Sequence, residues 1–286
     1  MRSEAALSRR VVPWIVPTLV LMGWEISARA GWLSYRVLPE PLAVANAAWE
    51  LMRSGEMWAD VKVSALRALG GFAIGGGIGF GLGLGTGLFK PLEAALDSTI
   101  QMIRNIPVLA MIPLVILWFG IEEEAKLFLV ALGVFFPVYM NTFHGIRSVD
   151  ANLVEMAKSY GVRGLALYRD VILPGALPSI LVGVRFALGL MWVMLIVAET
   201  ISAQSGIGYM TMNAREFMQT DNVVVGILLY ASLGKLADML ARGLERSLLP
   251  WHPAYGATLR QKAKRGREAV WAQAIKRPSS LRGVKA

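Results

Sequence analysis

The chain has 286 residues, a mean hydropathy of +0.52 and 55% apolar residues, which is too apolar for a soluble domain of this length. It has no cysteine, which excludes disulfides and thiolate metal sites, and its two histidines, His144 and His252, are too far apart in sequence to suggest a metal site. The net charge of +9 equals the +9 found from Arg242 onward, so the rest of the chain is neutral. A basic tail beside a membrane indicates contact with anionic lipid and weakens the case for nucleic-acid binding.

Several apolar stretches approach the roughly 20 residues that cross a bilayer core. The fold class we predict is an all-α polytopic membrane protein of about six transmembrane helices. The predicted spans are Val11–Ala28, Ser64–Phe89, Ile100–Phe119, Leu127–Phe143, Ile180–Ala198 and Val223–Leu240. The first run follows Arg9 and Arg10 but lacks a small-residue cleavage site and contains Pro13 and Pro17, so it is interpreted as a retained anchor.

Between the first two spans, the sequence predicts a turn followed by an amphipathic helix. Leu42, Ala45, Trp49 and Met52 would share one face of it. Such a helix would lie at the outer membrane–water interface or cap the helix bundle.

The second span contains glycines at intervals of four residues. One row is Gly71, Gly75, Gly79, Gly83 and Gly87, and a second row is Gly77, Gly81 and Gly85. Small residues at this spacing allow helix backbones to approach closely in lipid. A phosphate-binding glycine loop would need a preceding strand and a following Lys-Ser/Thr, which the sequence does not have, so we predict a packing surface.

Prolines interrupt the third and fourth spans. The third contains Asn105, Pro107 and Pro113, and the fourth contains Pro137. Proline inside a span is tolerated where neighbouring helices or a cavity satisfy the freed carbonyls, so these breaks indicate a pathway rather than an inert anchor.

Three charged features lie inside the predicted spans. Arg104 and Arg185 lie near cytoplasmic ends, and we interpret them as snorkelling, with contact to an anion as the alternative. Lys235 and Asp238, three residues apart, are predicted to pair with each other.

The loop after the fifth span is bordered by Glu199 and by residues 213–216. Gly206 and Gly208 break this loop. A re-entrant or gate-like segment and a plain extracellular turn are both compatible with the pattern.

A polar segment, Asp150–Pro178, separates the fourth and fifth spans. Asn152 and Glu155 have the spacing of a capping box, which predicts a short helix. Its apolar face would consist of Leu153, Met156, Ala157 and Tyr160. Gly161 is predicted to end the helix. A second short helix is predicted from Leu165 to Val171, before Pro174 and Pro178 end the segment.

The distribution of cations predicts that both termini and this segment lie in the cytoplasm. Nineteen cations fall on that side: Arg2, Arg9, Arg10, Lys90, Arg147, Lys158, Arg163, Arg169 and the eleven Lys and Arg from Arg242 onward. Five fall on the other side: Arg36, Arg53, Lys62, Lys126 and Arg215.

The spacing Glu155-Met156-Ala157, three residues, Gly161, nine residues, Val171, one residue, Leu173-Pro174 resembles the EAA loop of type I importer permeases of the ATP-binding-cassette (ABC) class. Met156 and Val171 depart from the usual alanine and isoleucine but remain apolar. Further stretches resemble the aliphatic-sulfonate permeases of the nitrate, sulfonate and taurine branch, from about Pro39 to about Tyr255. They include STIQMIRNIP, ILPGALPSILVGVRFALGLMW and VAETISAQSGIGYMTMNAREFMQTD.

The resemblance implies an inner-membrane permease that moves aliphatic sulfonates, or a related compound such as taurine or nitrate, by alternating access. Its implied partners are a second copy, two cytoplasmic ABC ATPase subunits and a periplasmic binding protein. The chain has no Walker A sequence, so we expect it not to be an enzyme, with ATP and Mg bound by the partner and no cofactor or metal of its own. For coupling we predict Glu155, Met156, Ala157, Gly161, Leu173 and Pro174, and for the translocation path Asn105, Pro107, Glu199 and Thr200.

The expected organisation is an anchor and outer helix in residues 1–60, a permease core in 61–250 with the coupling loop at 150–178, and a basic tail in 251–286. One alternative is an ion-gradient-driven secondary transporter, which should have an acid near the bilayer midplane. Glu25 and Asp238, the acids predicted near span interiors, lie towards the span ends. A membrane-embedded enzyme is the second alternative, but the sequence shows no cluster of His, Asp or Glu inside the bundle.

Overall fold

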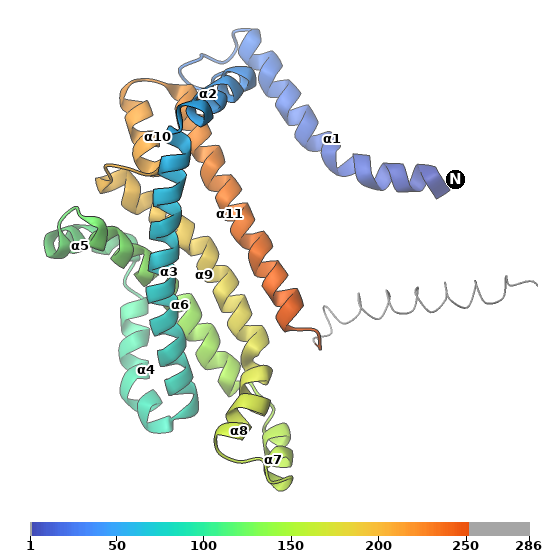
Figure 1. The fold of residues 1–286 in the computed structure, drawn as a ribbon, viewed down its shortest axis with the longest axis vertical. Helices are drawn as coiled ribbons and strands as arrows, with labels where there is room; N and C mark the ends of the chain where they lie inside the picture. Colours follow the sequence, from blue (N-terminus) through green and yellow to red (C-terminus); the bar gives the residue numbers. More distant parts are fainter. Residues whose placement is uncertain (1, 252–286) are drawn as a thin grey trace, which may run out of the picture.

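A computed structural model of the chain describes residues 2–251, and all regular structure within them is helical (Figure 1). The helices are α1 (Arg2–Arg29), α2 (Pro41–Ser54), α3 (Glu56–Leu88), α4 (Lys90–Arg104), the 3₁₀ turn η1 (Val108–Met111), α5 (Ile112–Phe119), α6 (Glu123–Arg147), α7 (Ala151–Ser159), α8 (Leu165–Leu167), the π-helical turn η2 (Tyr168–Ile172), α9 (Leu173–Ser202), α10 (Ile207–Glu216) and α11 (Thr220–Leu248). The basic tail and the short helix expected at Glu268–Ile275 lie outside the described residues.

Four helices of the described part are long and apolar enough to cross a membrane. They are α3, α6, α11 and the continuous helix Leu165–Ile201, which joins α8, η2 and α9. A fifth span arises if α4 and η1–α5 are counted as one bent element. The all-α membrane fold is thus confirmed. The number of six spans stays a prediction. It is compatible with these five spans together with α1, which contains the predicted span Val11–Ala28.

The predicted third span, Ile100–Phe119, is not one straight helix. Its first part belongs to α4, which begins at Lys90, and the chain bends by 84° before η1 and α5. Pro107 lies in the bend. It has no N–H to donate and disfavours helical geometry at the preceding residue, which explains the break. In Figure 1, α5 projects sideways from the bundle while α4 runs along it.

The first glycine row of α3 packs against α6, as predicted. A Cβ atom placed on Gly79 would lie 2.6 Å from the carbonyl oxygen of Phe135. The other glycines of this row also face α6 closely: Gly71, Gly75, Gly83 and Gly87. In the second row, Gly77 and Gly81 have no atom of another element within 4 Å of such a Cβ, so that row is not part of the α3–α6 contact.

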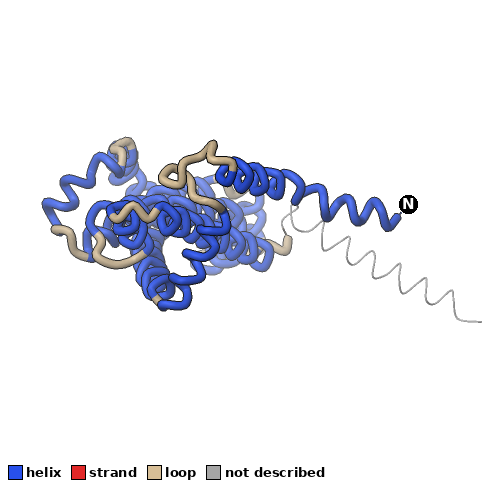
Figure 2. Tube along the Cα trace, turned by 90° about the horizontal axis from the view of Figure 1, so that it is seen from above, coloured by secondary structure: helices blue, strands red, loops and turns tan. Residues whose placement is uncertain are grey.

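Helix α2 lies at one end of the bundle, where it contacts α3 and α11, while α1 extends away to one side (Figure 2). The face it buries consists of Val44, Ala47 and Leu51. Leu42 and Trp49, on the face predicted from the sequence, are exposed. The helix is therefore confirmed, but the predicted apolar face is its exposed side and a different apolar face packs on the bundle. An exposed apolar side suits a membrane–water interface.

Candidate functional site

The N-cap of helix α7 lies two residues before the predicted capping residue. The carboxylate of Asp150 accepts a hydrogen bond from the backbone N–H of Asn152 at 2.9 Å, and the helix starts at Ala151. The predicted cap at Asn152 is therefore wrong. Aspartate is as good an N-cap as asparagine, so the earlier polar residue takes the position.

The apolar face of α7 points away from the bundle. Leu153, Met156 and Tyr160 are 42%, 52% and 83% exposed, respectively. A nine-residue helix is marginal in isolation, and exposed apolar residues on such an element mark an interaction surface. In Figure 1, α7 and α8 lie at the end of the bundle opposite α2 and α10.

Gly161 ends α7 as predicted. Its φ of +85° lies in the left-handed region, its N–H donates to the carbonyl of Lys158, and the N–H of Val162 donates to the carbonyl of Ala157, both at 3.0 Å. These two bonds define a Schellman motif, in which glycine at this position satisfies the last carbonyls without steric strain.

The return to the membrane differs from the prediction of a short helix ended by Pro174 and Pro178. The N–H of Leu173 donates to the carbonyl of Tyr168, five residues earlier, which forms the π-helical turn. The chain then continues directly into α9, with Pro174 in the first turn and Pro178 inside. Proline has no N–H to donate, so Pro174 and Pro178 each leave one carbonyl of the preceding turn without its usual helical partner.

The predicted coupling residues divide between two sides of this loop. Met156 is on the exposed face of α7, whereas Glu155 lines a cavity behind α7. Leu173 lines a smaller adjoining cavity at the start of α9. The structure therefore brings the two ends of the motif to neighbouring positions, and their role in coupling stays a prediction.

The predicted path residues do not gather at one place. Asn105 and Pro107 lie in the bend between α4 and η1. Pro107 lines a cavity of about 440 Å³ together with Arg104, Asn141 and Met194. Glu199 and Thr200 lie elsewhere, at the end of α9, so their common role in translocation stays a prediction.

A buried ionic network lies at the end of the bundle near α2 and α10, with Arg67 of α3 at its centre. Arg67 is 4% exposed. Its Nε and Nη2 each donate a hydrogen bond to one carboxylate oxygen of Glu123, both at 2.6 Å. Its Nη1 donates to Glu199 at 2.9 Å and to the carbonyl of Ser205 at 2.6 Å. One guanidinium therefore ties α3 to the start of α6, the end of α9 and the loop before α10.

Glu199 is 1% exposed, and protein groups surround its carboxylate. Besides Arg67, it accepts hydrogen bonds from Ser64 Oγ at 2.7 Å, from the Gly208 N–H at 2.9 Å and from the Tyr230 hydroxyl at 2.8 Å. These bonds compensate for burying the charge. Glu199 lies near the end of α9, as the sequence indicated, but its burial among four helices was not predicted.

The same network fixes the loop before α10. The N–H of Gly206 donates to Asp60 at 2.8 Å, and the N–H of Ile207 donates to Ser64 Oγ at 2.9 Å. Ile207, Met210 and Ala214 of α10 are buried. Of the two interpretations of this segment, the plain turn is excluded, and α10 folds back onto the bundle.

Sequence reasoning missed the centre of this network. Arg67 lies inside the predicted span Ser64–Phe89, and an ionisable residue within a span is itself a signal of a buried partner. The predicted pair of Lys235 with Asp238 is also wrong. Asp238 pairs with Arg185 of α9 and Arg242 of its own helix, each at 2.9 Å, because these guanidinium groups reach its carboxylate.

Comparison with known proteins gives the same picture of a permease. Residues 77–250 match the model of the family described as binding-protein-dependent transport system inner membrane component. The putative aliphatic sulfonates transport permease protein SsuC of Escherichia coli is 64% identical over 86% of this chain and 94% of its own length. The SsuC protein of Bacillus subtilis is 45% identical over 84% and 87%. The taurine transport system permease protein TauC of Escherichia coli is 41% identical over 58% and 60%. The chain therefore belongs to the family of binding-protein-dependent transport system inner membrane components, the membrane permeases of ABC importers.

Proposed function

We propose that the chain is the membrane subunit of an ATP-driven importer for aliphatic sulfonates, working by alternating access in the inner membrane with both termini in the cytoplasm. The likeness to proteins named as sulfonate permeases, over most of this chain's length, supports the substrate class. Taurine is the next candidate, since a taurine permease is also similar.

The observation that carries the proposal is the exposed apolar face of α7. The helix is capped at Asp150 and closed at Gly161, and its orientation leaves Leu153, Met156 and Tyr160 free to contact another protein. We assign this face to the cleft of a cytoplasmic ABC ATPase, which would bind ATP and Mg and perform the hydrolysis. Two ATPases, a second permease copy and a periplasmic binding protein would complete the importer.

The test is a binding assay with an ABC ATPase subunit that is co-expressed with the permease. Met156→Asp would place a charge in the apolar contact, so we expect it to abolish co-purification of the ATPase. The matched control is Phe217→Asp, which makes the same kind of change at an exposed position after α10, at the other end of the bundle. Equal ATPase recovery with Met156→Asp and wild type would contradict the docking role of α7.

The substrate is tested in proteoliposomes that contain the assembled complex. We expect binding protein loaded with an alkanesulfonate to stimulate ATP hydrolysis above binding protein loaded with taurine or left empty. Stimulation by taurine alone would reassign the substrate while leaving the permease role intact.

A further inference from the structure

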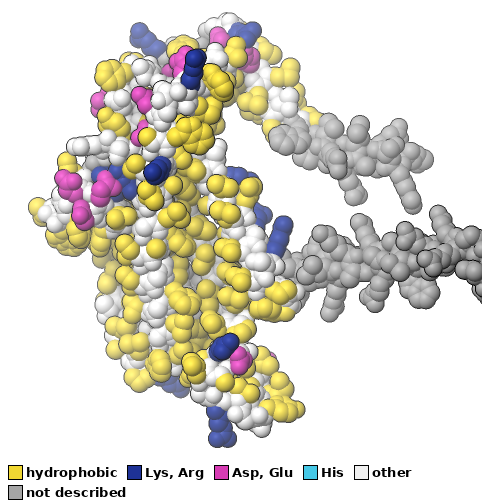
Figure 3. All heavy atoms as spheres, in the orientation of Figure 1, with side chains coloured by type: hydrophobic (Ala, Val, Ile, Leu, Met, Phe, Trp, Pro, Cys, Tyr) yellow, Lys and Arg dark blue, Asp and Glu magenta, His cyan; other side chains and the backbone are white. Residues whose placement is uncertain are grey.

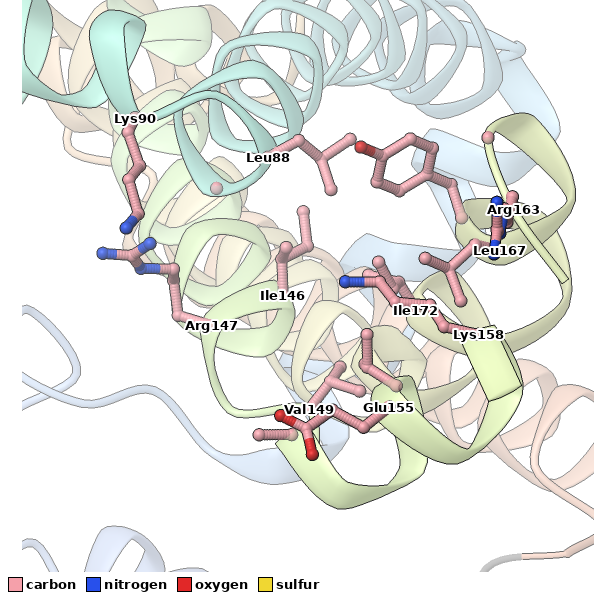
Figure 4. Close-up of a pocket in the computed structure, with 15 residues that line it drawn as sticks. Leu88, Lys90, Ile146, Arg147, Val149, Glu155, Lys158, Arg163, Leu167 and Ile172 are labelled. Atoms are coloured by element: carbon pink, nitrogen blue, oxygen red, sulfur yellow. The ribbon is translucent and has the colours of Figure 1, made fainter. Parts of the chain in front are cut away.

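Two adjoining cavities lie between α7 and the ends of the long helices, and Figure 4 shows the larger of them. The larger, of about 880 Å³, is bounded by the ends of α3 and α6, the start of α4, and α7 and α8. The smaller, of about 300 Å³, lies between the end of α3 and the start of α9. The two cavities adjoin, since both are lined by Leu88, Ile146, Tyr168 and Ile172.

The larger cavity is strongly basic. Its charged lining consists of Lys90, Arg147, Lys158, Arg163 and Glu155. Arg147 pairs with Glu93 at 2.9 Å, whereas the other three cations form no ion pair within the described part of the chain. In Figure 4, Lys90 and Arg147 lie close together at one edge, and the ammonium of Lys158 points inward. The cavity therefore offers uncompensated positive charge to an anion.

The smaller cavity is lined by apolar side chains, with Arg169 at its edge. They include Leu84, Leu88, Leu165 and Leu173. It lies where the apolar surface of the long helices ends, and Figure 3 shows this surface with basic side chains near α7 and α8. A basic cavity that leads into an apolar one at this level matches a ligand with an anionic head and a hydrocarbon chain.

We propose that the two cavities together bind one anionic phospholipid. Its phosphate headgroup would lie beside Lys158 in the larger cavity, where Lys90 and Arg163 add positive charge from opposite edges, and part of an acyl chain would lie along Leu165 and Leu173. The site lies at the ends of the apolar helices α3 and α6, where a hydrocarbon chain can follow their surface, which favours a phospholipid over a soluble alkanesulfonate of similar charge. The tail beyond residue 251 is itself basic, so it is disfavoured as an occupant. The proposal requires only that the chain is inserted in a membrane, and it holds whether or not α7 contacts an ATPase.

For the test, the full chain is placed in nanodiscs that contain equal amounts of phosphatidylglycerol and phosphatidylcholine. Native mass spectrometry then identifies the lipids that stay bound when the protein is released. We expect the wild type to retain phosphatidylglycerol preferentially. Lys90→Gln combined with Lys158→Gln should lower this preference by about fivefold per removed cation. The control combines Lys62→Gln and Lys235→Gln, which remove two exposed, unpaired cations of the described chain outside the cavities and should leave the preference unchanged.

Two further measurements separate the parts of the site and the sources of the anion. Leu165→Gln makes the smaller cavity polar and should weaken retention, whereas Leu117→Gln, at a similarly exposed position on α5, should not. Decanesulfonate added to the released protein should not displace the bound phosphatidylglycerol. Any of three results would overturn the proposal. These are equal retention of the two lipids by the wild type, a loss of phosphatidylglycerol retention in the control variants as large as in the cavity variants, and displacement of the bound phosphatidylglycerol by decanesulfonate.

Discussion

Glu199 is the residue whose surroundings limit substitution most. Its buried carboxylate accepts hydrogen bonds from Ser64, Arg67, Gly208 and Tyr230, so any replacement must leave several donors without an acceptor. Removing one partner of a buried ion pair costs about 3–5 kcal/mol, since the remaining charge is uncompensated. Glu123 remains on the other edge of the Arg67 guanidinium, which places the expected cost at the lower end.

We therefore predict that Glu199→Gln lowers the free energy of unfolding by about 3 kcal/mol. Thermal unfolding of the purified protein in detergent measures this change. The control is Glu93→Gln, which removes the partly exposed pair with Arg147 and should cost less than about 1 kcal/mol. Equal destabilisation by the two variants would show that the network contributes no more than a surface pair.

Substitution of Gly161 is limited by its backbone conformation and not by the space around it. Its φ is +85°, and a Cβ atom there would meet no atom within 4 Å. We predict that Gly161→Val displaces the end of α7 and strongly reduces ATPase co-purification, while Gly161→Asn keeps most of it, because asparagine tolerates the left-handed region.

The helix bundle should not register the change at Gly161, since the glycine lies in a loop outside it. The melting temperature of Gly161→Val should therefore match that of Gly243→Val, a control at a glycine of α11 that also has open space but a helical φ. Full ATPase binding by Gly161→Val would rule out a requirement for this backbone geometry.

At the scale of elements, the two glycine rows of α3 provide a matched comparison on one helix. Gly79 faces the backbone of α6, whereas Gly77 has open space. We predict that Gly79→Ala separates α3 from α6 and lowers the thermal stability and yield of the protein. Gly77→Ala should be neutral or stabilising by up to about 1 kcal/mol, since alanine favours a helix over glycine. Thermal unfolding in one detergent compares both, and similar values for the two variants would contradict the packing contact.

Apolar runs and glycine spacing predicted the long helices and the α3–α6 contact, but not all element ends. The polar residues Asp60 and Ser64 led to a predicted span that starts at Ser64, but α3 begins at Glu56. The side chains of Asp60 and Ser64 accept hydrogen bonds from the start of α10 and the loop before it, so these polar residues are accommodated within the helix. Pro107 signalled a break, but no local pattern gives the direction of an 84° bend. That direction depends on packing against distant helices.

The loop Asp150–Pro178 and the ionic network differ in how much of each could be predicted from the sequence. The first half of the loop depends on local signals, a cap, an apolar face and a terminating glycine, and the error there was a two-residue shift of the cap to Asp150. In the second half, the prolines predicted to end a short helix lie instead in a helix that continues into α9. The network joins groups far apart in the chain, such as Ser64 and Glu199, which are 135 residues apart. Only the fold brings such groups together, so charge alone could identify Arg67 but not its partners.

At the scale of the whole molecule, α7 and the segment after α10 lie at opposite ends of the bundle (Figure 1). The chain has no cysteine, so single cysteines can report sidedness without background. We predict that Tyr160→Cys reacts with a membrane-impermeant maleimide only in inside-out vesicles and Phe217→Cys only in intact spheroplasts, as both positions are exposed. Reaction of Tyr160→Cys in spheroplasts would reverse the orientation inferred from the cations.

The helix Leu165–Ile201 runs without interruption for 37 residues, from the loop behind α7 to the turn that contains Glu199. At 1.5 Å per residue it is about 55 Å long, so a tilt of about 5° about one end would move the other by about 5 Å, close to the rise of one helical turn. The element thus has the geometry of a lever arm. Force applied at the end beside α7 would be delivered as displacement at the hydrogen bonds that Arg67, Ser64 and Tyr230 make to Glu199, at the other end of the bundle.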